Sequence, residues 1–163
     1  MIIIYVKDIV FKEISKSLYY TLLSMNYECK MSNHIDSESD NLYILFGGHT
    51  LVQNPPKKYI VYQLEQFNVS IEKYGKVDIN IKQEYLNILY NSIKIWDYSK
   101  ENINYIKKKF NYKNICHVPI GFSQYLERIP KKSKKDIDIL FFGSLSKRRT
   151  KILDKLKKLV NIK

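Results

Sequence analysis

The sequence of 163 residues contains no alanine, three arginines and only two cysteines, Cys29 and Cys116. Two cysteines cannot frame a disulfide-rich fold, so we interpret both as reduced, small hydrophobic residues. No apolar run is long enough for a helix that crosses a bilayer. The opening residues, MIIIYVKD, are too short for the core of a signal peptide. We therefore expect a cytoplasmic protein without a membrane span.

The scarcity of arginine also weakens the case for a nucleic-acid partner. The formal net charge is +12, but 25 lysines supply nearly all of the positive charge. Lysine, isoleucine, asparagine and tyrosine have AT-rich codons and alanine has GC-rich ones, so an AT-rich genome accounts for the lysines without selection for a polyanion. Arginine makes the forked contacts to phosphates and bases that a nucleic-acid binder uses. A nucleic-acid partner is disfavoured on this ground.

The positive charge is concentrated near the end of the sequence. Residues 1–130 carry a net charge of +3, whereas residues 131–163 carry +9. The change coincides with a lysine-rich stretch. The sequence therefore predicts a Rossmann-like domain over residues 1–129, a basic linker over 130–136, and a strand–helix unit over 137–163.

Short apolar runs rich in β-branched residues alternate with amphipathic segments along the chain. Such runs are typical of strands buried on both faces, as in parallel sheets. Strands are predicted over residues 2–6, 42–46, 59–62, 93–97, 115–119 and 137–142, with a short one near 27–31. Helices are predicted over residues 9–26, from Asp78 to about 93, from Ser99 to about 112, and over 146–160. This alternation predicts the α/β class, a three-layer Rossmann-like sandwich with a mostly parallel sheet.

Polar or glycine residues follow several predicted strands, at the edge where open α/β sheets bind ligands. Glu65 follows residues 59–62 and Asp97 ends residues 93–97. A carboxylate there can accept the proton of a sugar hydroxyl, so both are catalytic candidates; each can equally cap a helix or turn. The further residues expected to line this cleft are Gly47, Gly48, His49 and Ser99. The glycine pair can instead form a simple tight turn.

Residues 139–149, ILFFGSLSKRR, carry the strongest local signal. Gly143 permits a sharp turn after an apolar run, and the amides of the helix that follows are unpaired, which makes an anion site. Arg148 and Arg149 in the first helical turn oppose the helix dipole, a conflict that a bound phosphate resolves. The predicted phosphate-binding residues are Gly143, Ser144, Arg148 and Arg149. The alternative is a plain turn with solvated arginines.

The histidines and cysteines do not suggest a metal site. Cys116 and His117 are adjacent, so their side chains point to opposite faces of a strand. His34 and His49 have no partners at the spacing of metal ligands. The glycine patterns of dinucleotide sites and phosphate loops, GxGxxG and GxxxxGK[ST], are missing. We expect neither a metal nor a bound cofactor.

Four segments in sequence order carry a family resemblance. They are YIVYQLEQF, IKIWDYSKENINYIKKKF, VPIGF and DIDILFFGSLSKRRTKILDKL. Together they resemble glycosyltransferases of the two-Rossmann-domain (GT-B) type, in particular the spore-maturation group and related proteins of large DNA viruses. The resemblance covers about residues 40–163. It implies an acceptor-side domain, the start of a donor-binding domain, and two substrates, a nucleotide sugar and a sugar acceptor.

The sequence departs from that family in the donor-binding domain. Family members carry a second Rossmann domain of similar size, and the carboxylate-containing donor motif has no counterpart here. We therefore expect no sugar transfer by the chain alone, and completion by a missing C-terminal domain or by self-association. Residues 137–142 are expected to join the edge of their own sheet or to pair with a second molecule, under Ile152, Leu156 and Leu159. The alternative function is a non-catalytic α/β module whose basic C-terminal helix binds a polyanion or a protein.

Overall fold

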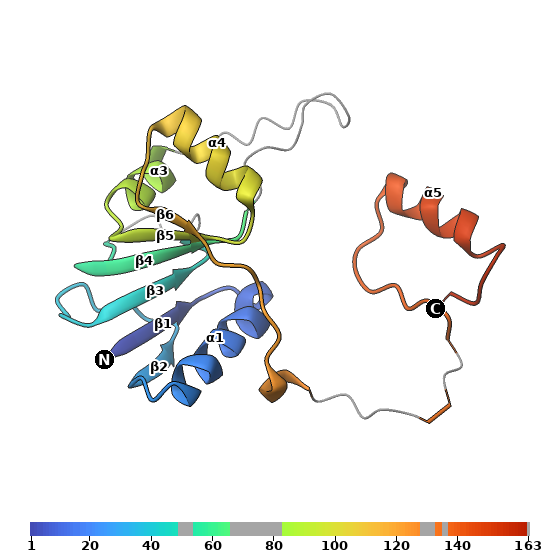
Figure 1. The fold of residues 1–163 in the computed structure, drawn as a ribbon, viewed down its shortest axis with the longest axis horizontal. Coiled ribbons are helices and arrows are strands. Elements are labelled where there is room, and N and C mark those ends of the chain that lie inside the picture. The colour runs from blue at the N-terminus through green and yellow to red at the C-terminus, as the bar shows by residue number, and fades with distance from the viewer. Residues whose placement is uncertain (49–53, 66–82, 128–132, 135–136, 163) are drawn as a thin grey trace. The chain divides into compact units, whose positions relative to one another are not determined.

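The computed structural model describes residues 1–48, 54–65, 83–127, 133–134 and 137–162 (Figure 1). The chain divides into two compact units, Met1–Glu127 and Arg128–Lys163.

The first unit is built on a six-stranded sheet in which every neighbouring pair is parallel, with the order β2-β1-β3-β4-β5-β6 (Figure 1). The strands are β1 (Ile2–Val6), β2 (Cys29–Ser32), β3 (Leu42–Phe46), β4 (Lys58–Gln63), β5 (Lys94–Asp97) and β6 (Ile115–His117). The predicted α/β fold with a mostly parallel sheet is confirmed.

Helices cover the sheet on both faces and make it a three-layer structure. Helix α1 (Lys12–Ser24) packs on one face, over Ile4, Ile44 and Phe46. Helices α3 (Gln83–Tyr90) and α4 (Lys100–Phe110) pack on the other, over a larger apolar cluster that includes Val61 and Ile95. Successive side chains of a strand point to opposite faces of the sheet. A strand that is apolar throughout therefore packs against the helices on both faces. Each such buried side chain contributes about 2 kcal/mol.

Local sequence signals set where the helices begin. Ser99 caps α4, and its hydroxyl accepts a hydrogen bond from the amide of Asn102 at 3.3 Å, as predicted. Helix α1 is preceded by a short 3-10 turn, η1 (Ile9–Phe11), which Asp8 caps. Asp78, expected to cap the next helix, lies outside the described residues, and α3 is described from Gln83. Among the described residues, no helix is long and apolar enough to cross a membrane.

The second unit contains helix α5 (Lys147–Leu156), capped by Ser146. The strand predicted over residues 137–142 is wrong. Its described residues make one isolated bridge, between Ile139 and Ile162, and all six strands of the sheet come from the first unit. Phe142 is 97% exposed. An apolar run forms a strand only where a neighbouring strand pairs its backbone groups, and a single bridge does not supply one.

Helix α5 packs against this segment in part as expected. Ile152 and Leu156 line a hollow of about 250 Å³ together with residues 139–141. Leu159, which was expected to join them, is 78% exposed. The helix ends at Leu156, so Leu159 is no longer held on the apolar face that the helical spacing predicted.

Candidate functional site

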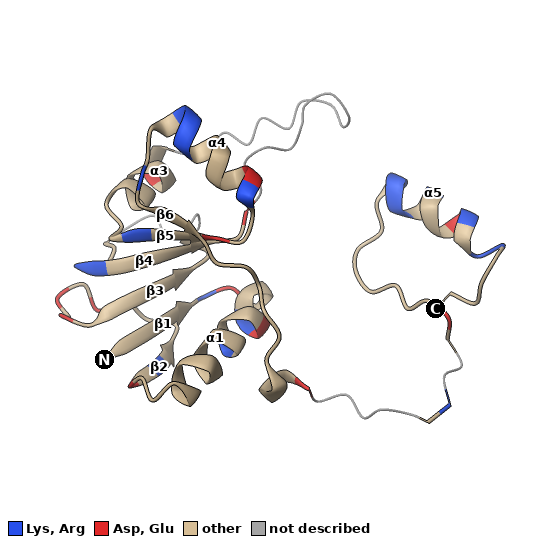
Figure 2. Cartoon of the chain, viewed as in Figure 1, with Lys and Arg blue, Asp and Glu red and all other residues tan. Residues whose placement is uncertain are grey.

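The carboxyl ends of the parallel strands meet at one edge of the first unit, and we call this the carboxyl edge. The chain runs from β1 to β2 on one side and then crosses to β3 on the other side of β1. Ligands of open α/β sheets bind outside the carboxyl ends, close to such a reversal of strand order. Figure 2 shows acidic residues, coloured red, close to where several strands end. A ligand site is therefore expected at this edge.

Most residues predicted for the cleft lie at the carboxyl edge. Gly47 and Gly48 follow β3, Glu65 follows β4, Asp97 ends β5, and Ser99 begins α4. His49 lies outside the described residues. The structure brings these groups to one edge, where Asp97, Ser99 and the backbone of Glu65 are joined in a packed polar network.

Asp97 is at the centre of this network. Its side chain is fully buried, at 0% exposure. The Ser99 amide donates to Asp97 Oδ1 at 2.8 Å, and Asn102 Nδ2 donates to Oδ1 and Oδ2 at 3.3 and 3.2 Å. Burial raises the pKa of Asp97 from its ordinary value of 3.8 to about 6, while the hydrogen bonds from Ser99 and Asn102 act in the opposite direction. A carboxylate enclosed in this way holds the start of α4 and does not reach a substrate.

Glu65 is fixed beside Asp97 through its backbone. Asn102 Nδ2 donates to the Glu65 carbonyl oxygen at 2.7 Å, and Gln63 Nε2 donates to the same oxygen. Gln63 Oε1 accepts from the Glu65 amide at 3.0 Å and from the Tyr85 hydroxyl at 2.8 Å. Gln63 and Asn102 are 1% and 3% exposed, whereas Glu65 is half-buried. Of the two predicted catalytic carboxylates, Glu65 is the one that solvent reaches.

The glycine pair after β3 allows close packing at the carboxyl edge. Gly47 has a φ of 69°, which side chains rarely adopt. A Cβ atom on Gly48 would lie 3.2 Å from Tyr85 Cε2 and 3.2 Å from Val61 Cγ1. Gly48 thus lets the ring of Tyr85 reach Gln63, so the tight-turn interpretation accounts for the described part of this segment.

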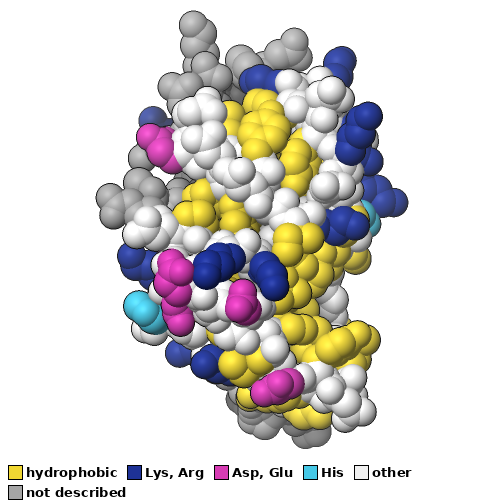
Figure 3. Space-filling view, turned by 90° about the vertical axis from the view of Figure 1, so that its left-hand side faces the viewer, with side chains coloured by type: hydrophobic (Ala, Val, Ile, Leu, Met, Phe, Trp, Pro, Cys, Tyr) yellow, Lys and Arg dark blue, Asp and Glu magenta, His cyan; other side chains and the backbone are white. Residues whose placement is uncertain are grey.

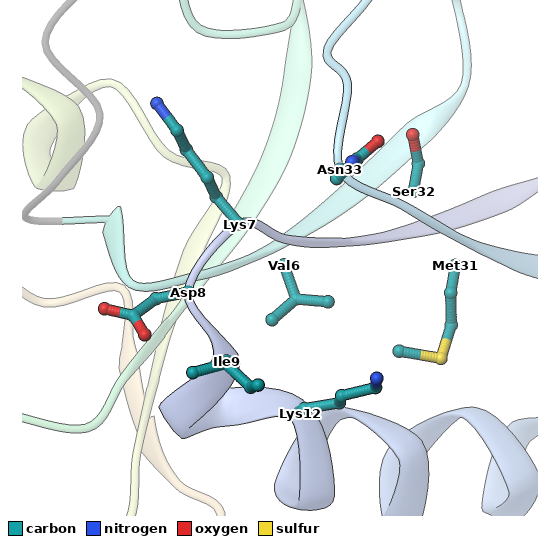
Figure 4. A pocket seen from close by; sticks show the side chains of 8 residues that line it. All are labelled: Val6, Lys7, Asp8, Ile9, Lys12, Met31, Ser32 and Asn33. Atoms are coloured by element: carbon teal, nitrogen blue, oxygen red, sulfur yellow. The ribbon is translucent and has the colours of Figure 1, made fainter.

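A hollow of about 570 Å³ lies at the carboxyl ends of β1 and β2, and sequence reasoning missed it (Figure 4). Its lining residues are Val6, Lys7, Asp8, Ile9, Lys12, Met31, Ser32 and Asn33. We call it the β1–β2 hollow. The signal that points to it is the one used for Glu65, because Lys7 and Asp8 directly follow a predicted strand. The sequence alone did not predict that β2 pairs with β1.

The turn at the start of α1 is not built to hold a diphosphate. Asp8 Oδ1 accepts a hydrogen bond from the Val10 amide at 3.0 Å. The negative side chain therefore occupies the place where a dinucleotide-binding fold receives its phosphates. This agrees with the missing glycine fingerprint after β1.

The predicted phosphate-binding residues lie in the second unit, around the start of α5. Gly143 has a φ of 138°. Arg149 Nη1 donates to the Ser144 carbonyl oxygen at 2.7 Å, and the Arg149 amide donates to Ser146 Oγ at 3.3 Å. Arg148 stands in the same first turn, which holds no acidic residue. The structure brings Gly143, Ser144 and Arg149 together in one turn and shows the Arg149 side chain folded onto it.

Other charged and metal-ligating groups do not form a second centre among the described residues. No three His, Cys, Asp or Glu side chains in that part of the chain are placed to hold a metal ion. The face at the amino ends of the strands carries lysine or arginine and acidic side chains between apolar ones (Figure 3). One ion pair there joins Lys57 to Glu38 at 3.1 Å. The surface charge on that face is therefore of mixed sign.

Comparisons with known proteins give viral relatives without an assigned activity. No family model and no solved structure matches the chain. The uncharacterized protein L140 of Acanthamoeba polyphaga mimivirus is 28% identical over 160 residues, which cover 85% of this chain and 50% of L140. The uncharacterized protein L137 of the same virus is 31% identical over 133 residues, covering 71% of this chain and 17% of L137. The chain spans about half the length of L140 and less of L137. Relatives in a virus agree with the expected viral connection, and the resemblance to glycosyltransferases stays a prediction.

Proposed function

We propose that this chain takes part in glycosyl transfer, moving a sugar from a nucleotide-sugar donor to a hydroxyl acceptor. In this proposal the first unit binds the acceptor and the second unit contributes to the donor site. One observation carries it: a solvent-accessible carboxylate, Glu65, is held at the carboxyl edge by Asn102 and Gln63 through its backbone. A parallel sheet with a fixed carboxylate at this edge is an arrangement suited to activating a bound hydroxyl.

The proposed chemistry needs two kinds of group. Glu65 accepts the proton of the acceptor hydroxyl as the new carbon–oxygen bond forms at the sugar. The bond from that sugar carbon to the donor phosphate breaks, and the nucleoside diphosphate leaves with the electron pair. Arg148 and Arg149 supply positive charge for the diphosphate, with the amides at the start of α5. Asp97 has a positioning role, because it holds the Asn102 side chain that fixes the Glu65 backbone.

The length of L140 supports the proposal indirectly. The region shared with this chain covers 50% of L140, which leaves length in L140 for a second domain of similar size. The two-domain arrangement implied by the resemblance needs that much additional chain.

The proposal is tested first by nucleotide binding. UDP, GDP and their sugars are titrated into the ¹⁵N-labelled chain while amide shifts are recorded. We expect shifts at residues 143–149, weakened in Arg149→Gln and unchanged in the control Lys151→Gln, which removes the same charge from α5. The absence of any shift in that turn, with every nucleotide at millimolar concentration, would refute the assignment of the donor site.

Turnover forms the second test. Release of nucleotide from UDP- and GDP-sugars is measured for L140 and for the 163-residue chain. We expect turnover by L140 and binding without turnover by the 163 residues, because these residues contain no counterpart of the donor motif of GT-B glycosyltransferases. Turnover by neither protein over a broad donor panel, together with the absence of shifts at residues 143–149, would overturn the proposed function.

A second candidate function is a non-catalytic binding module, and the surface of the second unit favours it. Leu140, Phe142, Leu145 and Leu159 are each at least two-thirds exposed. Along α5 lie several lysines and arginines with one acidic residue, Asp154 (Figure 2). Binding of heparin or an RNA homopolymer to residues 143–158, with no response to nucleotides, would favour this candidate over glycosyl transfer.

A further inference from the structure

The β1–β2 hollow has the size and position of a small-molecule site. Its volume of about 570 Å³ lies within the usual range of ligand pockets, about 300–1,000 Å³. It opens at the carboxyl ends of β1 and β2, beside the point where the strand order reverses. Its described lining includes none of the groups singled out from the sequence. It is therefore separate from the Asp97 network.

One side of the hollow is apolar. Val6 extends from the end of β1, Met31 from β2, and Ile9 from the turn before α1 (Figure 4). Ile9 is 77% exposed, so water covers much of its side chain in the free protein. A ligand with an apolar face, such as the C–H face of a sugar ring, displaces that water and gains from burial.

The charge around the hollow is positive. Lys7 and Lys12 both line it, and their side chains extend to different sides of β1, with the Lys12 amine on the side of Met31 (Figure 4). Asp8 is the only acidic residue in the described lining, and its carboxylate already accepts from the Val10 amide at 3.0 Å. The lining therefore carries two ammonium groups against one carboxylate that is engaged in a cap, and this balance favours an anion.

The polar rim supplies hydrogen bonds for hydroxyl groups. The Ser32 hydroxyl donates to the His34 carbonyl oxygen at 2.8 Å and accepts from the His34 amide at 3.0 Å. This pair of bonds fixes the turn that carries Asn33. The Asn33 side chain is exposed at the rim and offers both a donor and an acceptor.

We propose that the β1–β2 hollow binds a small sugar phosphate, with the phosphate at the Lys12 amine. Its ring packs on Val6 and Met31, and its hydroxyls meet Asn33. The inference rests on the proposed function in one respect, because it assigns the acceptor to the class of sugar phosphates. The hollow itself does not depend on the donor site, so the two are tested separately.

The test titrates glucose 6-phosphate into the ¹⁵N-labelled full chain, with inorganic phosphate, glucose and glucuronate as separate arms. We expect shifts at residues 6–12 and 31–33, with the tightest binding by glucose 6-phosphate. Each arm separates one contribution: inorganic phosphate tests the charge, glucose tests the ring, and glucuronate tests whether a carboxylate replaces the phosphate. Affinity should fall as salt is added, because exposed ammonium groups are screened.

Charge-removing variants locate the phosphate. Lys12→Gln should weaken binding about threefold to fivefold, and Lys7→Gln, on the other side of β1, by about twofold or less, since exposed ion pairs of this kind are worth about 1 kcal/mol or less. Lys16→Gln, one turn further along α1, removes the same charge without touching the hollow and should leave the affinity unchanged. Lys12 is exposed, so its substitution preserves the fold, which the dispersion of the same spectra verifies.

Three results would overturn the inference. They are equal affinity of Lys12→Gln and Lys16→Gln, shifts confined to residues outside the hollow, and binding of glucose or glucuronate as tight as that of glucose 6-phosphate. Nucleotide shifts at residues 143–149 are read from the same protein. The experiment can therefore refute sugar phosphate binding in the hollow without refuting nucleotide binding at residues 143–149, and the reverse.

Discussion

Replacing Asp97 by asparagine should change how the stability of the first unit depends on pH. Asp97 has a pKa of about 6 in the folded chain, against an ordinary value of 3.8. A raised folded pKa means that folding favours the protonated carboxyl. Its contribution is fully present below about pH 3.8 and is lost as the pH rises to about 6. The Asp97→Asn variant has no carboxyl group to titrate at this position, so it lacks this pH dependence.

The magnitude follows from the shift in pKa. A difference of about 2 units corresponds to about 3 kcal/mol of stability lost between pH 4 and pH 6. The substitution keeps an oxygen that accepts from the Ser99 amide, but it places an amide group opposite Asn102 Nδ2 and costs about 1 kcal/mol. Near pH 4 the variant should therefore be less stable than the wild type by about 1 kcal/mol, and near pH 7.5 more stable by about 2 kcal/mol.

Urea unfolding monitored by tryptophan fluorescence measures this difference. Trp96 is the only tryptophan in the sequence and lies in β5, directly before Asp97. Comparison of the wild type with Asp97→Asn at each pH cancels the contributions of the other carboxylates. If the difference in unfolding free energy between the two proteins stayed constant from pH 4 to pH 7.5, the argument that burial raises the pKa of Asp97 would be refuted.

Three further substitutions test other parts of the structure. Gly48→Ala sets a methyl group against the α3 tyrosine ring and should cost about 1–2 kcal/mol; an unchanged melting temperature by circular dichroism would contradict this. Asn102→Ala removes the donor shared by the Glu65 carbonyl oxygen and both Asp97 carboxylate oxygens and should cost about 2–3 kcal/mol in urea unfolding, whereas the exposed Asn104→Ala should cost little. Ser146→Ala removes the cap of α5 and should destabilise that helix by about 1 kcal/mol, measured by amide exchange at residues 149–156; protection equal to the wild type would show that the cap is unimportant.

The sequence predicted the first unit well because burial on both faces leaves a continuous apolar run. Residues 2–6 and 42–46 coincide with β1 and β3. Residues 137–142 have the same pattern but form only one bridge. The pattern reports that a segment is apolar and extended, whereas a strand also needs a neighbour, and the neighbour is not encoded in the segment itself.

The candidate site was predictable in position and less so in character. The rule that ligands meet the ends of parallel strands placed Glu65 and Asp97 at the carboxyl edge. It did not distinguish an enclosed carboxylate from an accessible one, because enclosure depends on how α4 turns back and brings Asn102 over Asp97. The β1–β2 hollow was missed for a related reason, since it joins residues that are 25 positions apart, such as Val6 and Met31.

The two edge strands of the sheet, β2 and β6, are the ones that could pair with strands of another molecule. Strand β6 has three residues and is soon followed by Pro119, and the other border strand, β2, has four residues and carries an exposed lysine, Lys30. Short borders with a proline or a charge discourage sheets from extending between molecules. Residues 139–142 have neither safeguard and expose Leu140 and Phe142. Crowded or heated solutions of the protein should therefore aggregate through this stretch, and not through the sheet.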